Sequence, residues 1–124
     1  MSGFLTNLDI QLIDEDTTWR LASPLVYLCD LLSCRITVPA GFKTDLASVP
    51  RLPMIYAMWG DRVHREAVLH DYLYRAGAFP SVTFEMANQI FFEAMTSRGV
   101  SAWIRYPMYW AVSMFGRQFF KENL

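Results

Sequence analysis

DRVHREAVLHDYLYRAG, residues 61–77, has the pattern of a complete helix. Its apolar residues recur at helical spacing, and Gly77 is a typical helix end. Since residue i+4 of a helix lies one turn above residue i, His70 and Tyr74 share one face, whereas Asp71 points about 100° away. The stretch is therefore predicted to be a helix whose polar groups lie on two different faces.

The residues before this helix are predicted to form strands. Apolar and polar residues alternate at 8–12, and two further strand-like segments cover 18–29 and 34–42. Alternation with a period of two, interrupted by turn-forming residues, favours an antiparallel meander of two or three strands.

From Pro50 onward the spacing becomes helical. Helical segments are predicted at 50–60, 83–99 and 101–124, and Pro107 is predicted to divide or kink the last of them. The fold class is therefore α+β, with a small N-terminal antiparallel β-meander followed by three to four helices. We expect a single domain over residues 1–124, with strands at about 3–45 and helices at about 50–122.

Composition narrows the possible functions. The chain has 124 residues, 53% of them hydrophobic, which is enough for one domain with its own core. Eleven basic and twelve acidic residues give a net charge of -1, which does not favour nucleic acid as a partner. The first residues lack the basic start and apolar core of a signal peptide, so none is expected. Cys29 and Cys34 could pair across a turn or remain reduced.

The C-terminal helix has an uncharged, aromatic-rich stretch at 106–116, with an arginine on either side. Eleven residues are too few for a transmembrane span, which needs about 20. Two alternatives remain. The helix is either the centre of the core, or it carries an exposed aromatic surface that binds a protein partner or a bilayer surface. The residues predicted to bind a partner are Trp103, Tyr109 and Trp110.

Asn88 is the candidate partner of the polar pair His70 and Asp71. It is followed at helical spacing by Phe91, Phe92 and Met95, so it lies beside an apolar stripe. A buried amide without a hydrogen bond costs about 1–3 kcal/mol, so Asn88 is expected to bond to the neighbouring antiparallel helix. In one interpretation the resulting network only holds two helices in register. In the other, Asn88 orients His70 as a base that takes a proton from water or substrate.

VPAGFKTDLASVPR, residues 38–51, could connect the strands to the helices or contribute a metal site. Asp45 and Ser48 have the spacing of a capping turn ahead of Pro50, which is the structural alternative. Together with loop carbonyls, Asp45 and Asp71 would instead form the set of hard oxygen ligands that calcium prefers.

Five motifs carry a resemblance to a known family. In order they are WRL (19–21), VPAGFKTDLASVPR (38–51), AVLHDYLYR (67–75), FFEAM (91–95) and AVSMFG (111–116). This ordered set resembles the bacteriophage and prophage family called domain of unknown function 1353. The resemblance implies a phage or prophage origin, a location in the host cytoplasm or the virion, and other phage proteins or the host envelope as partners. It implies no particular activity.

A second resemblance concerns mechanism. HDYLY, residues 70–74, is similar to the helical core of phospholipase A2. That similarity implies His70 as the base that activates water, Asp71 as a calcium ligand and Asn88 as the residue that orients the histidine, with Tyr74 completing the motif. The sequence departs from that family because it has no glycine-rich calcium loop and no disulfide set. It also has an amide where the orienting carboxylate is expected, and an amide cannot stabilise an imidazolium by charge.

Two functional hypotheses follow. The first is a phage-encoded accessory protein with a hydrolase-like His70/Asp71/Asn88 centre, metal-assisted if calcium binds, that acts on an ester or amide of the host envelope. It predicts a water-accessible cleft and different bonding of the two nitrogens of His70. The second is a non-catalytic virion or tail-associated component. It predicts a buried His70 with every polar atom paired, and exposure of Trp103, Tyr109 or Trp110.

Overall fold

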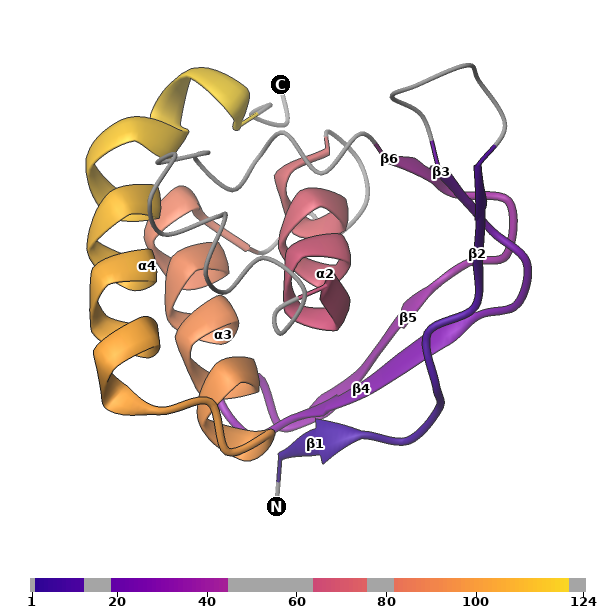
Figure 1. The fold of residues 1–124 in the computed structure, drawn as a ribbon, viewed down its shortest axis with the longest axis horizontal. Coiled ribbons are helices and arrows are strands. Elements are labelled where there is room, and N and C mark those ends of the chain that lie inside the picture. The colour runs from indigo at the N-terminus through magenta and orange to yellow at the C-terminus, as the bar shows by residue number, and fades with distance from the viewer. Residues whose placement is uncertain (1, 13–18, 45–63, 76–81, 121–124) are drawn as a thin grey trace.

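The computed structural model describes residues 2–12, 19–44, 64–75 and 82–120. The predicted helix at 50–60 and Asp45 lie outside the described residues. Within them, strands come first and helices second (Figure 1), so the α+β class with N-terminal strands is confirmed.

The described strands form two three-stranded antiparallel sheets instead of one meander. In spatial order the first sheet contains β1 (Gly3–Phe4), β4 (Leu25–Cys29) and β5 (Cys34–Val38). The second contains β2 (Ile10–Leu12), β3 (Trp19–Leu21) and β6 (Lys43–Thr44).

Prolines account for the division into two sheets. The predicted strand segment 18–29 is split between β3 and β4, and Pro24, which has no N–H to donate to a ladder, lies between them. Pro39 likewise follows β5. Gly41 then turns the chain back with a φ of 88°, and its N–H donates to the Leu21 carbonyl at 2.8 Å. β6 therefore pairs with β3 and not with β5.

The β4–β5 hairpin forms one wall of the core. Its register pairs Leu25 with Val38 and Cys29 with Cys34, and both cysteines are free thiols. Alternate residues of β4 are buried, as expected for a strand with one face on the core. The prediction of period-two strands in this region is therefore correct.

Three α-helices and a short 3-10 helix follow in the described residues. They are α2 (His64–Tyr74), α3 (Phe84–Ser97), α4 (Ala102–Phe115) and η2 (Gly116–Phe119). Helix α3 lies between α2 and α4 and packs against both, while α2 is the helix nearest the second sheet (Figure 1). The Thr83 hydroxyl caps α3 by accepting from Met86 N at 3.2 Å. Among the described helices, none is long and apolar enough to cross a bilayer.

Pro107 does not divide the last helix, because α4 continues through it to Phe115. The ring removes the backbone N–H that would otherwise bond to the Trp103 carbonyl one turn earlier in the helix. Ile104, Met108 and Val112 bury one side of α4 in the core, and this packing holds the helix together across the proline.

Candidate functional site

Asn88 joins two side chains of the neighbouring helix through a single oxygen atom. Its Oδ1 lies 2.7 Å from Nε2 of His70 and accepts a hydrogen bond of 2.6 Å from the Tyr74 hydroxyl. His70 and Tyr74 come from the same face of α2, as their spacing predicts, and Asn88 comes from the facing side of α3. We call these three residues the His70 network.

The bond to Asn88 sets the tautomer of His70. An amide oxygen only accepts, so the proton of the neutral ring is on Nε2 and the lone pair is on Nδ1. Nδ1 is buried and has no hydrogen-bond partner within the described part of the chain. The two ring nitrogens therefore differ in their bonding, as the hydrolase hypothesis predicts.

The His70 network is closed to solvent. His70 has no exposed surface, and Asn88 and Tyr74 are about as fully buried. The imidazole packs against the Tyr74 ring at 4.0 Å and the Phe91 ring at 4.7 Å between centroids. The hypothesis of a non-catalytic component predicts this burial. It also predicts that every polar atom of His70 is paired, which Nδ1 is not.

Burial also determines which protonation states occur. It lowers the pKa of His70 from 6.5 to about 4, and the bond to Asn88 offsets the effect only in part. The pKa of Tyr74 is raised by the same desolvation. At neutral pH the network is therefore an uncharged imidazole, an amide and a phenol.

Asp71 points to a different set of partners. Its Oδ2 lies 3.1 Å from Nη2 of Arg75, one turn further along α2. Arg75 also donates to the Lys43 carbonyl at 3.3 Å and lies over the Phe42 ring. Asp71 thus helps attach α2 to β6 through Arg75, whereas Asn88 contacts His70 and Tyr74.

Of the two residues proposed to bind a metal, Asp45 lies outside the described residues. The second, Asp71, forms an ion pair with the guanidinium of Arg75. In the described ranges there is no group of three or more His, Cys, Asp or Glu side chains that could hold a metal ion.

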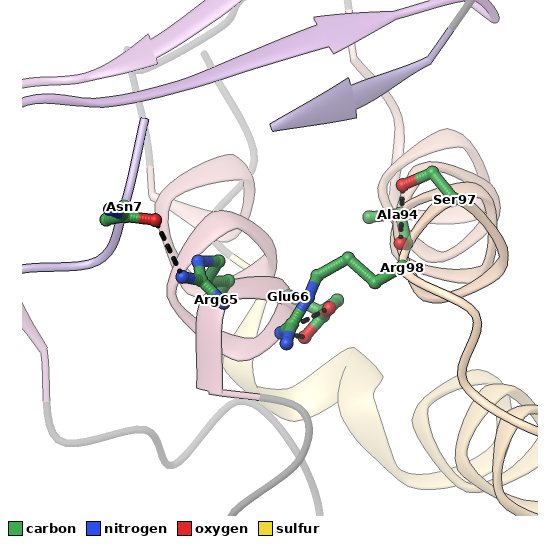
Figure 2. A network of polar contacts seen from close by, with 6 residues as sticks. All are labelled: Asn7, Arg65, Glu66, Ala94, Ser97 and Arg98. Carbon is green, nitrogen blue, oxygen red and sulfur yellow. Dashed lines mark hydrogen bonds and ion pairs between the residues drawn. The ribbon is translucent and has the colours of Figure 1, made fainter. Parts of the chain in front are cut away.

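A buried ion pair next to the His70 network was not predicted. Glu66 is fully buried, and Nη1 of Arg98 donates to both of its carboxylate oxygens, at 3.0 and 3.3 Å (Figure 2). Burial raises the pKa of Glu66, while its own backbone hydrogen bond and Arg98 lower it. Glu66 lies about one turn before His70 on α2, and residues 66, 70 and 74 share one face, so this spacing is the signal that could have revealed it.

Figure 2 also shows how this region connects the elements. Arg65, next to Glu66, donates to Asn7 Oδ1 at 3.1 Å, which links α2 to the segment after β1. Arg98 follows the C-terminal end of α3. The ion pair therefore joins the start of α2 to the end of α3.

Glu93 is a second acidic residue that was not predicted as an anchor. Its carboxylate accepts hydrogen bonds from the Tyr27 hydroxyl at 2.5 Å, from Asp30 N at 3.2 Å and from Leu31 N at 2.9 Å. It thereby fixes the β4–β5 turn onto α3. Burial raises the pKa of Tyr27, and the nearby carboxylate raises it further.

The predicted partner-binding residues lie away from the His70 network, on α4. Trp103 is 84% exposed and Trp110 is 63% exposed. Tyr109 is partly buried, with its ring 5.3 Å from that of Phe92. Both alternatives for this helix are therefore partly correct, since one side is core and the other is an exposed aromatic surface.

With this α+β fold, the chain belongs to a family that is described as a protein of unknown function (DUF1353). The model of that family matches residues 19–112, which include the His70 network and most of α4. No curated protein and no solved structure matches the chain.

Proposed function

We propose that the protein is a hydrolase in which Nδ1 of His70 acts as the general base on an ester or amide bond of a bacterial envelope. The observation that carries this proposal is the buried Nδ1 without a hydrogen-bond partner, on a ring whose other nitrogen is held by Asn88. A buried polar atom without a partner is uncommon in native proteins, and a catalytic role is one of the explanations for it.

The proposed step begins with a water molecule at Nδ1. Nδ1 takes one proton from the water as its oxygen attacks the carbonyl carbon. When the carbon–oxygen or carbon–nitrogen bond breaks, the imidazolium returns the proton to the leaving group. Asn88 and Tyr74 hold the ring during both transfers. Asn88 supplies no negative charge to the imidazolium, so the turnover is expected to be slow compared with a histidine paired to a carboxylate.

This function requires a conformational change, because His70 has no exposed surface. Water or substrate can reach Nδ1 only when the packing around the ring opens. Contact with the envelope substrate is the event that we propose to trigger this opening. Calcium held by Asp45 and Asp71 is also part of the proposal, so the test includes it.

The test measures release of fatty acids and of amide-linked fragments from isolated bacterial envelopes, with calcium and with a chelator. It compares wild type with His70→Gln, and with His64→Gln as a matched control, since both histidines belong to α2. We expect turnover in wild type and the control but not in His70→Gln, with all three folded by circular dichroism. Turnover that survives in His70→Gln, or is absent from wild type in both conditions, contradicts the proposal.

A second candidate function is supported by the closure of the His70 network. We infer as the alternative a non-catalytic virion or tail-associated component in which the network only packs α2 against α3. Complete burial of all three side chains favours it. In that case no envelope preparation is hydrolysed, and His70→Gln simply lowers the melting temperature.

Both candidates share a proposed phage or prophage setting, in the host cytoplasm or in the particle, which is supported by the ordered motifs in the sequence. Mass spectrometry of purified particles, compared with lysate, separates the two locations. Detection in the particle favours the second candidate, and exclusion from it favours the first.

A further inference from the structure

Four large apolar side chains form a row along the outer surface of α4. They are Trp103, Tyr106, Trp110 and Met114, and each is more than half exposed. Their spacing of three, four and four residues keeps them on one stripe of the helix. We call this set the α4 row. Its members face away from the core, which α4 contacts through Ile104, Met108 and Val112 on its other side.

The α4 row is large enough to form a small protein interface. Given about 150–250 Å² for a buried aromatic side chain, the four residues together expose roughly 500 Å². A patch of this size is at the upper end for a monomer, where the largest patch is about 300–600 Å². Two such rows facing each other would bury roughly 1,000 Å², which is near the lower limit of a specific protein interface.

We propose that the occupant of the α4 row is a second copy of this chain, bound through an antiparallel pair of α4 helices. The spacing of the row is nearly the same read in either direction. With a two-fold axis beside residue 108, Trp103 lies at the level of Met114 of the second copy, and Tyr106 lies at the level of Trp110. Each of these residues is offset from its partner on the second copy by about half a residue, which is less than about 1 Å along the helix axis. The row is therefore self-complementary, as a two-fold interface requires.

The chemistry of the facing groups agrees with this pairing. It brings Trp110 against Tyr106, an aromatic pair, and Met114 against Trp103, a sulfur–aromatic pair. A parallel pair would align the two helix dipoles unfavourably, whereas the antiparallel pair opposes them.

A hollow beside the row provides space for a side chain of the second copy. It has a volume of about 270 Å³ and is lined by Gln89, Phe92, Tyr106 and Tyr109, between α3 and α4. This is slightly below the range of about 300–1,000 Å³ typical of small-molecule sites. Because Tyr106 lines the hollow, Trp110 of the second copy is at the right level to enter it.

A lipid surface fits the row less well. Helices that lie in a membrane interface combine an apolar face with a polar face rich in lysine and arginine. Helix α4 has a single arginine, whose Nη1 is bonded to the Val100 carbonyl at 2.9 Å. A two-fold dimer is therefore the occupant that the described residues favour.

The first experiment is sedimentation of the full chain over micromolar to millimolar concentrations, with wild type, Trp110→Glu and a control, Leu5→Glu. Leu5 is also an exposed apolar residue, but it lies after β1 and not on α4. The mass is expected to rise from 14.4 kDa toward twice that value in wild type and the control. Trp110→Glu is expected to raise the dissociation constant about 30-fold or more, as for a central interface residue.

A second experiment fixes the orientation in a Cys34→Ser background. Chains with Tyr106→Cys are mixed with chains with Trp110→Cys under mild oxidation. The antiparallel pair predicts cross-links mainly between the two variants. Cross-links mainly between identical chains overturn the proposed pairing. Three other results also overturn the proposal. They are a wild type that sediments as a monomer at every concentration, a dimer that Trp110→Glu leaves intact, and a monomer that binds lipid vesicles through Trp110.

Discussion

The hydroxyl of Tyr74 lies directly against Gly116, at the point where α4 ends and η2 begins. A Cβ atom at residue 116 would lie only 2.6 Å from the Tyr74 hydroxyl oxygen. The backbone of Gly116, with a φ of -80°, is open to any residue, so the requirement for glycine there is one of space. The same hydroxyl donates to Asn88. The absence of a side chain at Gly116 therefore leaves the space that Tyr74 needs to take part in the His70 network.

Substitution Gly116→Ala is therefore expected to destabilise the protein by about 1–3 kcal/mol, as for other overpacked cores. Denaturant unfolding measures the loss. Gly3→Ala is the control, because a Cβ at residue 3 meets nothing within 4 Å. Tyr74→Phe removes the hydroxyl that clashes, so adding it should reduce the cost of Gly116→Ala. If the two changes are simply additive, the close approach of Tyr74 and Gly116 is not the cause.

The pH dependence of stability follows from His70. Its pKa is about 4 in the folded protein and 6.5 when unfolded, so the unfolded chain takes up the proton first as the pH falls. The contribution of neutral His70 to the free energy of unfolding is fully present above pH 6.5. It is lost progressively from there to pH 4, by about 3 kcal/mol in total. Urea unfolding of wild type and His70→Gln across this range isolates the effect. If the free energies of unfolding of the two proteins changed with pH in the same way, His70 would have the same pKa in the folded and unfolded states.

Loss of the Asn88 amide leaves two buried donors, His70 Nε2 and the Tyr74 hydroxyl, without an acceptor. Asn88→Ala is expected to cost about 2–4 kcal/mol for that reason. Gln89→Ala, the next residue of α3, is exposed and serves as the matched control, with an expected change within about 0.5 kcal/mol. Equal melting temperatures for the two variants would mean that the network contributes little to stability.

Removal of Arg98 leaves the Glu66 carboxylate buried without its cation. Arg98→Gln is expected to cost about 3–5 kcal/mol at neutral pH. Because burial raises the pKa of Glu66 and Arg98 lowers it, Arg98→Gln should cost least at acid pH, where the carboxyl is protonated, when it is compared with wild type at the same pH. The cost relative to wild type should grow as the pH rises through 4.5, where the unfolded carboxyl releases its proton first.

The double variant Glu66→Gln/Arg98→Gln tests this explanation. It has no charge at this buried pair, so thermal melting should show that it recovers part of the stability lost in Arg98→Gln. Its stability relative to wild type should also lose the pH dependence that comes from the Glu66 carboxyl. A double variant less stable than Arg98→Gln at neutral pH is incompatible with a cost that comes from the uncompensated carboxylate.

Periodicity predicts the described helices, the main strands and part of the site. Alternation marks β4, and helical spacing places His70 and Tyr74 on one face with Asn88 on the next helix. These are local properties that each segment carries in its own sequence. The contact of His70 with Asn88 was expected, whereas a catalytic role for it stays a prediction.

Long-range pairing could not be read in the same way. β1 pairs with β4 and β3 pairs with β6, so the division into two sheets depends on contacts between segments far apart in the chain. The partner of Glu66 is 32 residues away at Arg98. The burial of such a charge is decided by the packing of α2 on α3, which no single segment reveals.

The most direct test of the central claim is nitrogen-15 NMR of the His70 ring across a pH titration. The account predicts a neutral ring with its proton on Nε2 down to a pH of about 4, and a lone pair on Nδ1. It also predicts that Asn88→Ala removes the preference for this tautomer. A proton on Nδ1 in the wild type would contradict this description of the network, because that nitrogen would then have no lone pair to act as a base. A pKa near 6.5 would also contradict it, because it would mean that the ring is not closed off from water.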